Sequence, residues 1–160
     1  MSGLVVKTAV VPNTPAVVEA VITNDGWFPD IDPAKLRAEY RIRDNVTAER
    51  LRGAIIGAIV TVGNQLAVWQ AARMALTPTG LVDVPAPKID GISRNVLLYG
   101  RAIGAYAKAE LVESTRDIDT TTAGQREADQ LEPSVVELRR DALHAIRDML
   151  GRPRLRAELI

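Results

Sequence analysis

Two aspartates stand two residues apart in the stretch "WFPDIDP", and this spacing could serve a metal ion or an acid–base pair. Asp30 and Asp32 could chelate a hard cation, but a calcium loop needs more oxygen ligands at set spacings and a bidentate glutamate, which the stretch lacks. A helix start explains the same residues, because Asp32 can cap the helix and Pro33 fits its first position. We therefore predict a structural anchor for the first helix, formed by Trp27, Phe28, Pro29, Asp32 and Pro33.

The other residue types that carry chemistry lack the neighbours that catalysis needs. His144 is the only histidine, and it stands in "RRDALHAIRDML" with no second histidine and no nucleophile beside it, whereas a zinc site needs three or four ligands. The chain has no cysteine, and none of its few serines lies in a nucleophile-elbow context. Neither a phosphate-binding loop nor a dinucleotide fingerprint is present. We predict no catalytic residue, no metal site and no cofactor, and hence a protein that is not an enzyme.

The composition is typical of a single globular domain. Of 160 residues, 47 % are hydrophobic and only 4 % aromatic, so the core must be built from alanine, valine, isoleucine and leucine, and alanine favours helices. The 20 basic and 20 acidic residues cancel, which argues against bulk attraction to nucleic acid or to an anionic membrane. We see no signal peptide and no apolar run that approaches the roughly 20 residues of a membrane span, so we expect no membrane partner.

Helix-start signals and apolar periodicity predict two helices in the first half of the chain. The stretch "DPAKLRAEYRI" predicts a short helix that ends near Arg43. Thr47 caps a second helix that runs to about Met74, and its glycines are expected to mark close helix contacts: Gly53, Gly57 and Gly63. Its apolar residues recur at three- and four-residue spacing: Leu51, Ile55, Ala58, Ile59, Val62, Leu66 and Trp69.

The second half of the chain predicts a loop and two further helices. Prolines and glycines punctuate "TPTGLVDVPAPKIDG", which is typical of a loop. Ser93 can cap the third helix, whose apolar stripe comprises Val96, Tyr99, Ile103, Tyr106 and Leu111. Pro133 lies in the first turn of the fourth helix, which ends at Gly151. The apolar positions of the fourth helix are Val136, Leu138, Leu143, Ile146 and Leu150.

These elements predict an all-α fold. We expect a small helical bundle with one long central helix, an extended N-terminal arm and an extended C-terminal tail. Valine and threonine favour extended structure in residues 1–26, and two prolines interrupt it, so we assign the arm to this segment. The helical domain then covers residues 27–150, and the tail covers residues 151–160.

Opposite charges alternate along the fourth helix, which indicates a solvated face or an inter-subunit ion-pair face rather than a nucleic-acid patch. The candidate ion-pair face comprises Arg139, Arg140, Asp141, Arg147 and Asp148. The tail, "GRPRLRAELI", mixes three arginines with aliphatic residues and ends on Leu159 and Ile160. The residues alone are compatible both with docking on a partner protein and with a loose chain end.

Three blocks of the sequence stand out when they are taken together. The first block is "WFPDIDPAKLRAEYRI" followed by "VTAERLRGAI", and the second is "LVDVPAPKIDG" with "SRNVLLYGRAI". The third is "READQLEPSVVELRRDALHAIRDMLGRPR", which places acidic, helical and Arg-Pro elements in this order. In their order and spacing the blocks resemble the head completion proteins of contractile-tailed phages, which are helical head–tail connectors that attach beneath the portal. The resemblance covers residues 27–160, and the order and spacing of the blocks make it specific. We match nothing in the family to residues 1–26.

The resemblance implies a structural role in the neck of the virion, reached after assembly in the host cytoplasm. Family members are expected to form a homo-oligomeric ring, dodecameric to match the portal, once DNA is packaged. The ring would extend the DNA channel, help to retain DNA and offer a platform for the tail, with the portal protein and tail or neck terminator proteins as partners. DNA would pass through the lumen without sequence-specific binding. The implied portal-docking residues are Arg152, Pro153, Arg154, Leu155, Arg156, Leu159 and Ile160.

Two other classes of function fit parts of the sequence. A transient helical assembly adaptor or chaperone would share the composition and the lack of an active site, but it would have no permanent place in the particle. A nucleic-acid-binding regulator could use the arginines of the fourth helix. Zero net charge and the lack of a helix-turn-helix with a basic recognition helix argue against the regulator.

Overall fold

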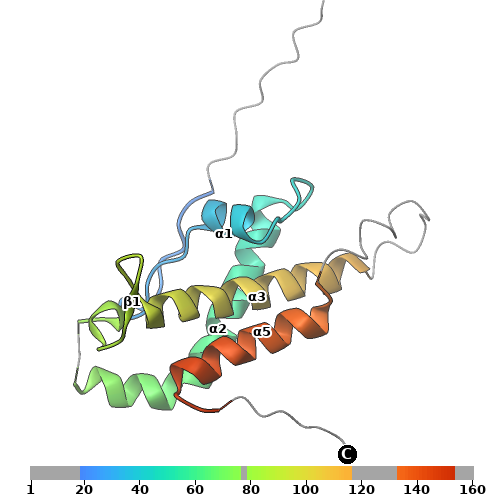
Figure 1. The fold of residues 1–160 in the computed structure, drawn as a ribbon. Coiled ribbons are helices and arrows are strands. Elements are labelled where there is room, and N and C mark those ends of the chain that lie inside the picture. Colours follow the sequence, from blue (N-terminus) through green and yellow to red (C-terminus); the bar gives the residue numbers. More distant parts are fainter. Residues whose placement is uncertain (1–18, 77–78, 117–132, 154–160) are drawn as a thin grey trace, which may run out of the picture.

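The computed structural model describes residues 19–76, 79–116 and 133–153. Over these ranges, four α-helices accompany one turn of 3-10 helix and two short strands (Figure 1). The helices are α1 (Pro33–Glu39), α2 (Ala48–Met74), α3 (Arg94–Arg116) and α5 (Val135–Met149). The 3-10 turn is η1 (Leu81–Asp83), and the strands are β1 (Lys88–Ile89) and β2 (Ile92–Ser93). Helices α3 and α5 lie side by side, and α2 crosses behind them (Figure 1).

The first two helices begin where the sequence predicts. Asp32 accepts hydrogen bonds from the backbone N–H groups of Ala34 (2.9 Å) and Lys35, and Pro33 occupies the first turn. Thr47 caps α2 by accepting from the N–H of Arg50. Both caps satisfy donors that a helix start leaves without an intrahelical partner.

Helix α1 ends earlier than predicted. Its last residue is Glu39 rather than a residue near Arg43, and Tyr40 is the C-cap. The next residue, Arg41, has a φ of 48°, which is left-handed backbone that a helix cannot contain. The N–H of Ile42 then returns to the carbonyl of Arg37, which closes the helix end.

Helix α5 has defined signals at both ends. Ser134 and Glu137 form a capping box, in which the Ser134 hydroxyl accepts from the Glu137 N–H and the Glu137 carboxylate accepts from the Ser134 N–H. The second of these bonds lowers the pKa of Glu137. At the other end, Gly151 has a φ of 66°, and the N–H of Arg152 donates to the carbonyl of Arg147 at 2.9 Å. This Schellman arrangement stops α5 at the predicted glycine.

The predicted apolar face of α5 is partly wrong. Val136 and Leu143, which were named among the apolar positions of this helix, are exposed, at 75 % and 43 %. The buried face includes small residues instead: Val135, Leu138, Ala142, Ala145, Ile146 and Met149. Helix α5 packs mainly on α3, which also buries several alanines, so small buried residues on both helices allow them to pack closely. The prediction chose large aliphatic residues and left out the alanines, so it included two positions that are exposed.

The all-α prediction is wrong, because β1 and β2 form an antiparallel hairpin within the predicted loop. Lys88 pairs with Ser93, and Ile89 pairs with Ile92. The turn between them consists of Asp90 and Gly91, with φ values of 51° and 74°. Positive φ at both central positions is what an Asp-Gly turn provides, and its twist matches the strands. The Asp-Gly dipeptide in "KIDGIS" is typical of a hairpin turn, but the nearby prolines led to the prediction of a loop.

Ser93 does not cap α3 as predicted. The residue belongs to strand β2, and its buried hydroxyl finds no hydrogen-bond partner among the described residues. The start of α3 is instead tied to the loop before the hairpin, where the N–H of Arg94 donates to the carbonyl of Pro87 at 2.9 Å. The hairpin is thus attached directly to the third helix.

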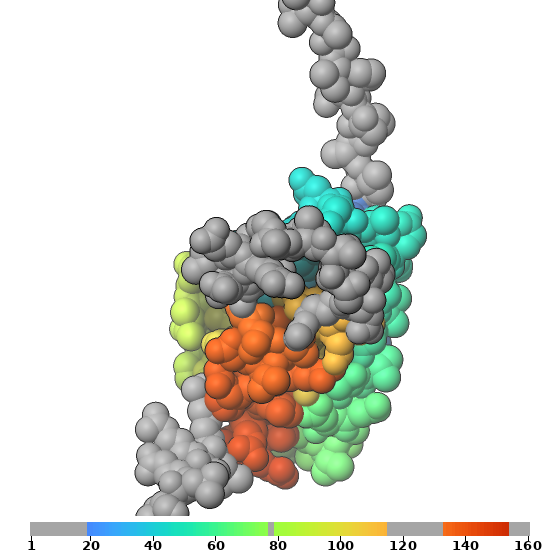
Figure 2. All heavy atoms as spheres, turned by 90° about the vertical axis from the view of Figure 1, so that its right-hand side faces the viewer, coloured from blue at the N-terminus to red at the C-terminus, as the bar shows by residue number. Residues whose placement is uncertain are grey.

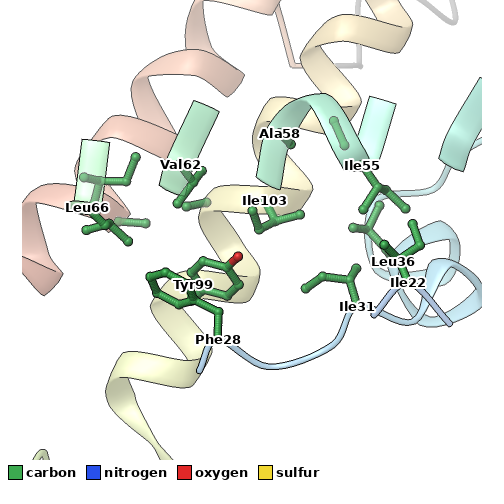
Figure 3. Packing of buried hydrophobic residues seen from close by; sticks show 14 of the residues in the cluster. Ile22, Phe28, Ile31, Leu36, Ile55, Ala58, Val62, Leu66, Tyr99 and Ile103 are labelled. Atoms are coloured by element: carbon green, nitrogen blue, oxygen red, sulfur yellow. The ribbon is translucent and has the colours of Figure 1, made fainter. Parts of the chain in front are cut away.

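The main core lies between the inner face of α2 and the middle of α3. Figure 3 shows Ile55, Val62 and Leu66 of α2 together with Tyr99 and Ile103 of α3. The predicted stripe of α2 is confirmed at its centre, since Leu51, Ile55, Val62 and Leu66 are all fully buried. Of the stripe predicted for α3, the residues that are buried are Tyr99, Ile103 and Leu111.

Part of the segment assigned to the N-terminal arm lies in this core. Ile22 is buried, and it forms a two-bond bridge with Ile31, with N···O distances of 2.8 and 3.0 Å. Glu19 makes an ion pair with Arg37 of α1. Residues 1–18 of the predicted arm lie outside the described residues, and so do residues 154–160 of the predicted tail.

Gly104 allows the ring of Tyr40 to lie against α3. A Cβ at Gly104 would overlap this ring, and the Tyr40 hydroxyl donates to the carbonyl of Arg101 at 3.0 Å. A Cβ at Gly100, one turn earlier on the same helix, would meet no described atom within 4 Å. Gly104 therefore makes room for Tyr40, whereas Gly100 makes room for no described atom, although both lie inside α3.

We predict that Gly104→Ala lowers the free energy of unfolding by about 1–3 kcal/mol, because the tyrosine must be displaced. The matched control is Gly100→Ala, which should raise it by about 0.5–1 kcal/mol, since alanine is the better helix former and no neighbour is displaced. Urea unfolding followed by circular dichroism measures both. Equal effects of the two substitutions would contradict the assigned contact.

Candidate assembly surfaces

The two aspartates of "WFPDIDP" accept backbone hydrogen bonds rather than facing a common site. Asp30 accepts from the N–H of Asn24 at 2.9 Å, and Asp32 is the cap of α1. Within residues 19–76, 79–116 and 133–153, no group of three or more His, Cys, Asp or Glu side chains could hold a metal ion. The arrangement around both carboxylates is therefore that of a folded turn.

A third aspartate, which the sequence analysis did not single out, organises this turn. One oxygen of Asp25 accepts from the N–H groups of Trp27 (3.0 Å) and Phe28 (2.8 Å). Its other oxygen accepts from the side-chain amide of Gln70 on α2 at 2.8 Å. The signal that could have indicated this role is the order Asn-Asp-Gly before the aromatic pair, because Asp commonly bonds the backbone two or three residues further on.

The turn inserts two aromatic rings between α2 and α3. Phe28 stacks on Tyr99 of α3, with ring centroids 4.4 Å apart and planes 9° apart. Trp27 meets Phe28 at 4.9 Å and Trp69 of α2 at 6.0 Å, both edge to face. The predicted anchor residues thus join three elements: Trp27 and Phe28 contact α2 and α3, while Asp32 and Pro33 start α1. The carbonyl of Pro29 accepts from the amide of Asn24 at 3.2 Å.

Burial perturbs two tyrosines in this region. Burial disfavours the phenolate and raises the pKa of Tyr99 to about 12, and the nearby Asp25 carboxylate acts in the same direction. The amide of Asn24, which donates to the Tyr99 hydroxyl at 2.7 Å, acts in the opposite direction. Burial likewise raises the pKa of Tyr40 to about 12.

The predicted ion-pair face of α5 is partly engaged within the chain. Arg139 pairs with Glu113 of α3 at 2.5 Å, and Asp141 pairs with Arg101 of α3 at 3.6 Å. Arg140 lies near Glu137 on the exposed side of the helix. The remaining members, Arg147 and Asp148, are half-buried, as is His144. A role of this face between subunits stays a prediction.

The predicted docking tail begins at the end of α5. Arg152 and Pro153 are exposed immediately after the Gly151 turn. The other residues assigned to portal docking lie outside the described residues: Arg154, Leu155, Arg156, Leu159 and Ile160. Their role in docking therefore stays a prediction.

The outer side of α2 is an apolar surface that the sequence analysis missed. From Gly53 to Ala72 the helix contains no Asp, Glu, Lys or Arg. Val60 and Val68 are 57 % and 87 % exposed there, and Ile56 is also exposed. We call this surface the α2 flank and define it by Gly53, Ile56, Val60, Gly63, Ala67 and Val68. The run of uncharged residues could have been recognised in the sequence, but the prediction considered only the apolar stripe on the inner side of α2.

The same run corrects the expectation about apolar length. Within the described ranges, α2 is the one helix that is long and apolar enough to cross a membrane, by length and composition only. A third of its most apolar window is buried inside the protein. Such a helix also occurs in the core of proteins that never enter a membrane, so this property alone is weak evidence.

A model of the phage head completion protein (GPL) family matches residues 22–160. The chain belongs to this family. It is 39 % identical to the head completion/stabilization protein of Escherichia phage P2 over 147 residues, which are 92 % of this chain and 86 % of the relative. It is 29 % identical to the probable head completion/stabilization protein of Haemophilus phage HP1 over 139 residues, which are 85 % and 89 % of the two chains. No solved structure matches the chain.

Membership of the head completion family confirms the resemblance and fixes the broad class of function. The family is one of structural phage proteins and not of enzymes. The match begins at Ile22, the residue that bridges to Ile31 in the core, and it extends through the tail to Ile160.

We predict that the stability of this head completion protein falls as the pH rises from 10 to 12, in the window set by Tyr99 and Tyr40. Each has a pKa raised above its unfolded value of 10, so its contribution is complete below pH 10 and is lost as pH rises through the folded pKa. Urea midpoints across this window should fall less steeply for Tyr99→Phe than for the native chain. An equal fall in both proteins would contradict the burial assigned to Tyr99.

Proposed function

We propose that this head completion protein forms a ring beneath the portal once DNA has been packaged. The ring extends the DNA channel, helps to retain the packaged DNA and provides the platform for tail attachment. The observation that carries the proposal is the family match over residues 22–160, together with two relatives that are named as head completion/stabilization proteins. The partners would be the portal protein, further copies of the chain, and tail or neck terminator proteins.

The physical properties of the chain support this role. A ring requires heterologous contacts, in which one face of a subunit meets a different face of its neighbour. A net charge of zero suits a channel wall that DNA passes without sequence-specific binding. The ring is expected to be dodecameric to match the portal, and the protein would stand in the neck of the virion after assembly in the host cytoplasm.

The tail is the segment that we assign to portal contact. Gly151 ends α5 in a left-handed conformation and Pro153 prevents the helix from resuming, so the chain leaves α5 at this point. Residues 152–160 combine three arginines with leucine and isoleucine, which can make ion pairs and apolar contacts on another protein. The family match includes this segment to its last residue.

We predict that the full-length chain co-sediments with the assembled portal in a ring-like ratio, and that a chain ending at Gly151 does not. The matched control carries the residues of positions 152–160 in shuffled order, so that length and charge are kept while the sequence is lost. This control should bind like the truncated chain. Circular dichroism of all three proteins checks that the bundle remains folded.

Other results would change the proposal in defined ways. Binding by both the full-length and the truncated chain would keep the ring but move the portal contact to the helical domain. Binding by the shuffled chain would show that charge, and not sequence, directs the tail. No binding by any form to an intact portal would contradict the proposal and favour a transient assembly adaptor.

A further inference from the structure

The α2 flank is unusual for the solvent side of a surface helix. Such a helix normally carries charged residues opposite its core face. Here the side opposite Leu51, Val62 and Leu66 presents Val60 and Val68, and the charged residues of α2 stand only near its ends. Asn64, which lies between these valines, is exposed and polar but uncharged, and exposed apolar side chains on an uncharged helix side commonly mark a protein contact.

The glycines of α2 point to the same conclusion. They were expected to mark close helix contacts, but a Cβ at Gly53 or at Gly63 would meet nothing within 4 Å among the described residues. Only Gly57 of the three has a near neighbour there, the carboxylate of Glu110. Each glycine inside a helix costs about 0.5–1 kcal/mol relative to alanine. No described part of the chain explains Gly53 and Gly63, whereas small residues allow the backbone of another molecule to approach.

A second apolar surface lies on the hairpin. Ile89 and Ile92 are cross-strand partners, so their side chains lie on the same face of the hairpin, and they are 58 % and 41 % exposed. The Asp90–Gly91 turn and the bond from Arg94 to Pro87 fix the hairpin on α3. We call these two isoleucines the hairpin pair.

Helix α2 and the hairpin region lie on opposite sides of the molecule. In Figure 2, α2 forms the right-hand side, the hairpin region lies at the left-hand edge, and α5 lies between them. In a ring of many copies, the two contact faces of one subunit point in nearly opposite directions. Two contact faces at right angles to each other would instead close a ring of about four copies. The sides of the molecule formed by α2 and by the hairpin region meet the first requirement.

We propose that the α2 flank of one copy packs against the hairpin pair of the next copy around the ring. This contact deepens the proposed function and rests on it. It buries the exposed valines of α2 beneath two isoleucines, and it uses Gly53 and Gly63 as the positions where the neighbouring backbone approaches. The occupant of the α2 flank is therefore a second copy of this chain.

Three other occupants fit the α2 flank less well. A membrane would leave the hairpin pair without a role, and the buried inner face of α2 already packs on α3. The arginine-rich tail and DNA would find no opposite charge between Gly53 and Ala72. The outer face of α5 bears Val136 and Leu143, but it lies between the two sides in Figure 2 and carries Arg140 and Arg147.

Cysteine cross-linking tests the contact directly, because the chain contains no cysteine. The test variant is Val60→Cys with Ile92→Cys, and the matched control is Val60→Cys with Leu143→Cys, which pairs the same helix with the exposed face of α5. Each is bound to the assembled portal and treated with a short bismaleimide. We expect a ladder of many linked copies for the test variant and at most a trace for the control.

A charge substitution tests the same contact without a reagent. Val60→Glu places a carboxylate on the α2 flank, and Leu143→Glu places one on α5. Because both side chains are exposed, both variants should keep the urea midpoint of the native chain. We expect Val60→Glu to reduce the number of copies bound per portal by at least about tenfold at limiting concentration, and Leu143→Glu to leave it near the native number.

The outcomes separate this contact from the proposed function. If the native chain binds the portal but the test variant gives no more ladder than the control, the contact is wrong and the connector role remains. If Val60→Cys alone gives a discrete dimer, α2 meets α2 across a two-fold axis, which also overturns the contact. If the native chain does not bind an intact portal, the proposed function and this contact both fail.

Discussion

Phe28 stacks on Tyr99 at the centre of the protein, and the placement of the other elements depends on this contact. The ring reaches this position because Asp25 holds the backbone of the preceding turn and at the same time binds Gln70 of α2. Trp27 extends the contact to Trp69, so one short turn joins α2 and α3. In a chain with few aromatic residues, this cluster supplies rigid packing that the aliphatic stripes alone would not specify.

The sequence predicted those features that depend on neighbouring residues along the chain. Asp32, Thr47 and Gly151 act as helix ends because capping needs only a side chain or a backbone conformation within a few residues. Features that depend on distant packing were harder to predict. The buried face of α5, which packs mainly on α3, includes two alanines, and the role of Asp25 depends on Gln70, which is remote in sequence. The hairpin was a local signal that the prolines around it concealed.

Helix α2 serves the protein on two sides. Its inner residues complete the core with α3, while its outer side carries no charged residue between Gly53 and Ala72 and includes glycines that have no near neighbour among the described residues. A subunit that acts alone would gain stability from alanine and polar residues at these positions. A head completion protein that acts in a ring would gain more stability from an uncharged surface that another copy can cover. The fold therefore combines a locally anchored bundle with surfaces suited to assembly.

Electron cryo-microscopy of DNA-filled heads isolated before tail attachment would locate the chain in the particle and show its contacts with the portal and with its neighbouring copies. We expect a closed ring of this chain directly beneath the portal, with α5 leading into a tail that contacts the portal and α2 facing the hairpin of the neighbouring copy. Density for the chain elsewhere on the capsid, or its absence from heads that retain DNA, would contradict the connector role. A ring with α2 exposed to solvent would contradict the assigned contact between copies.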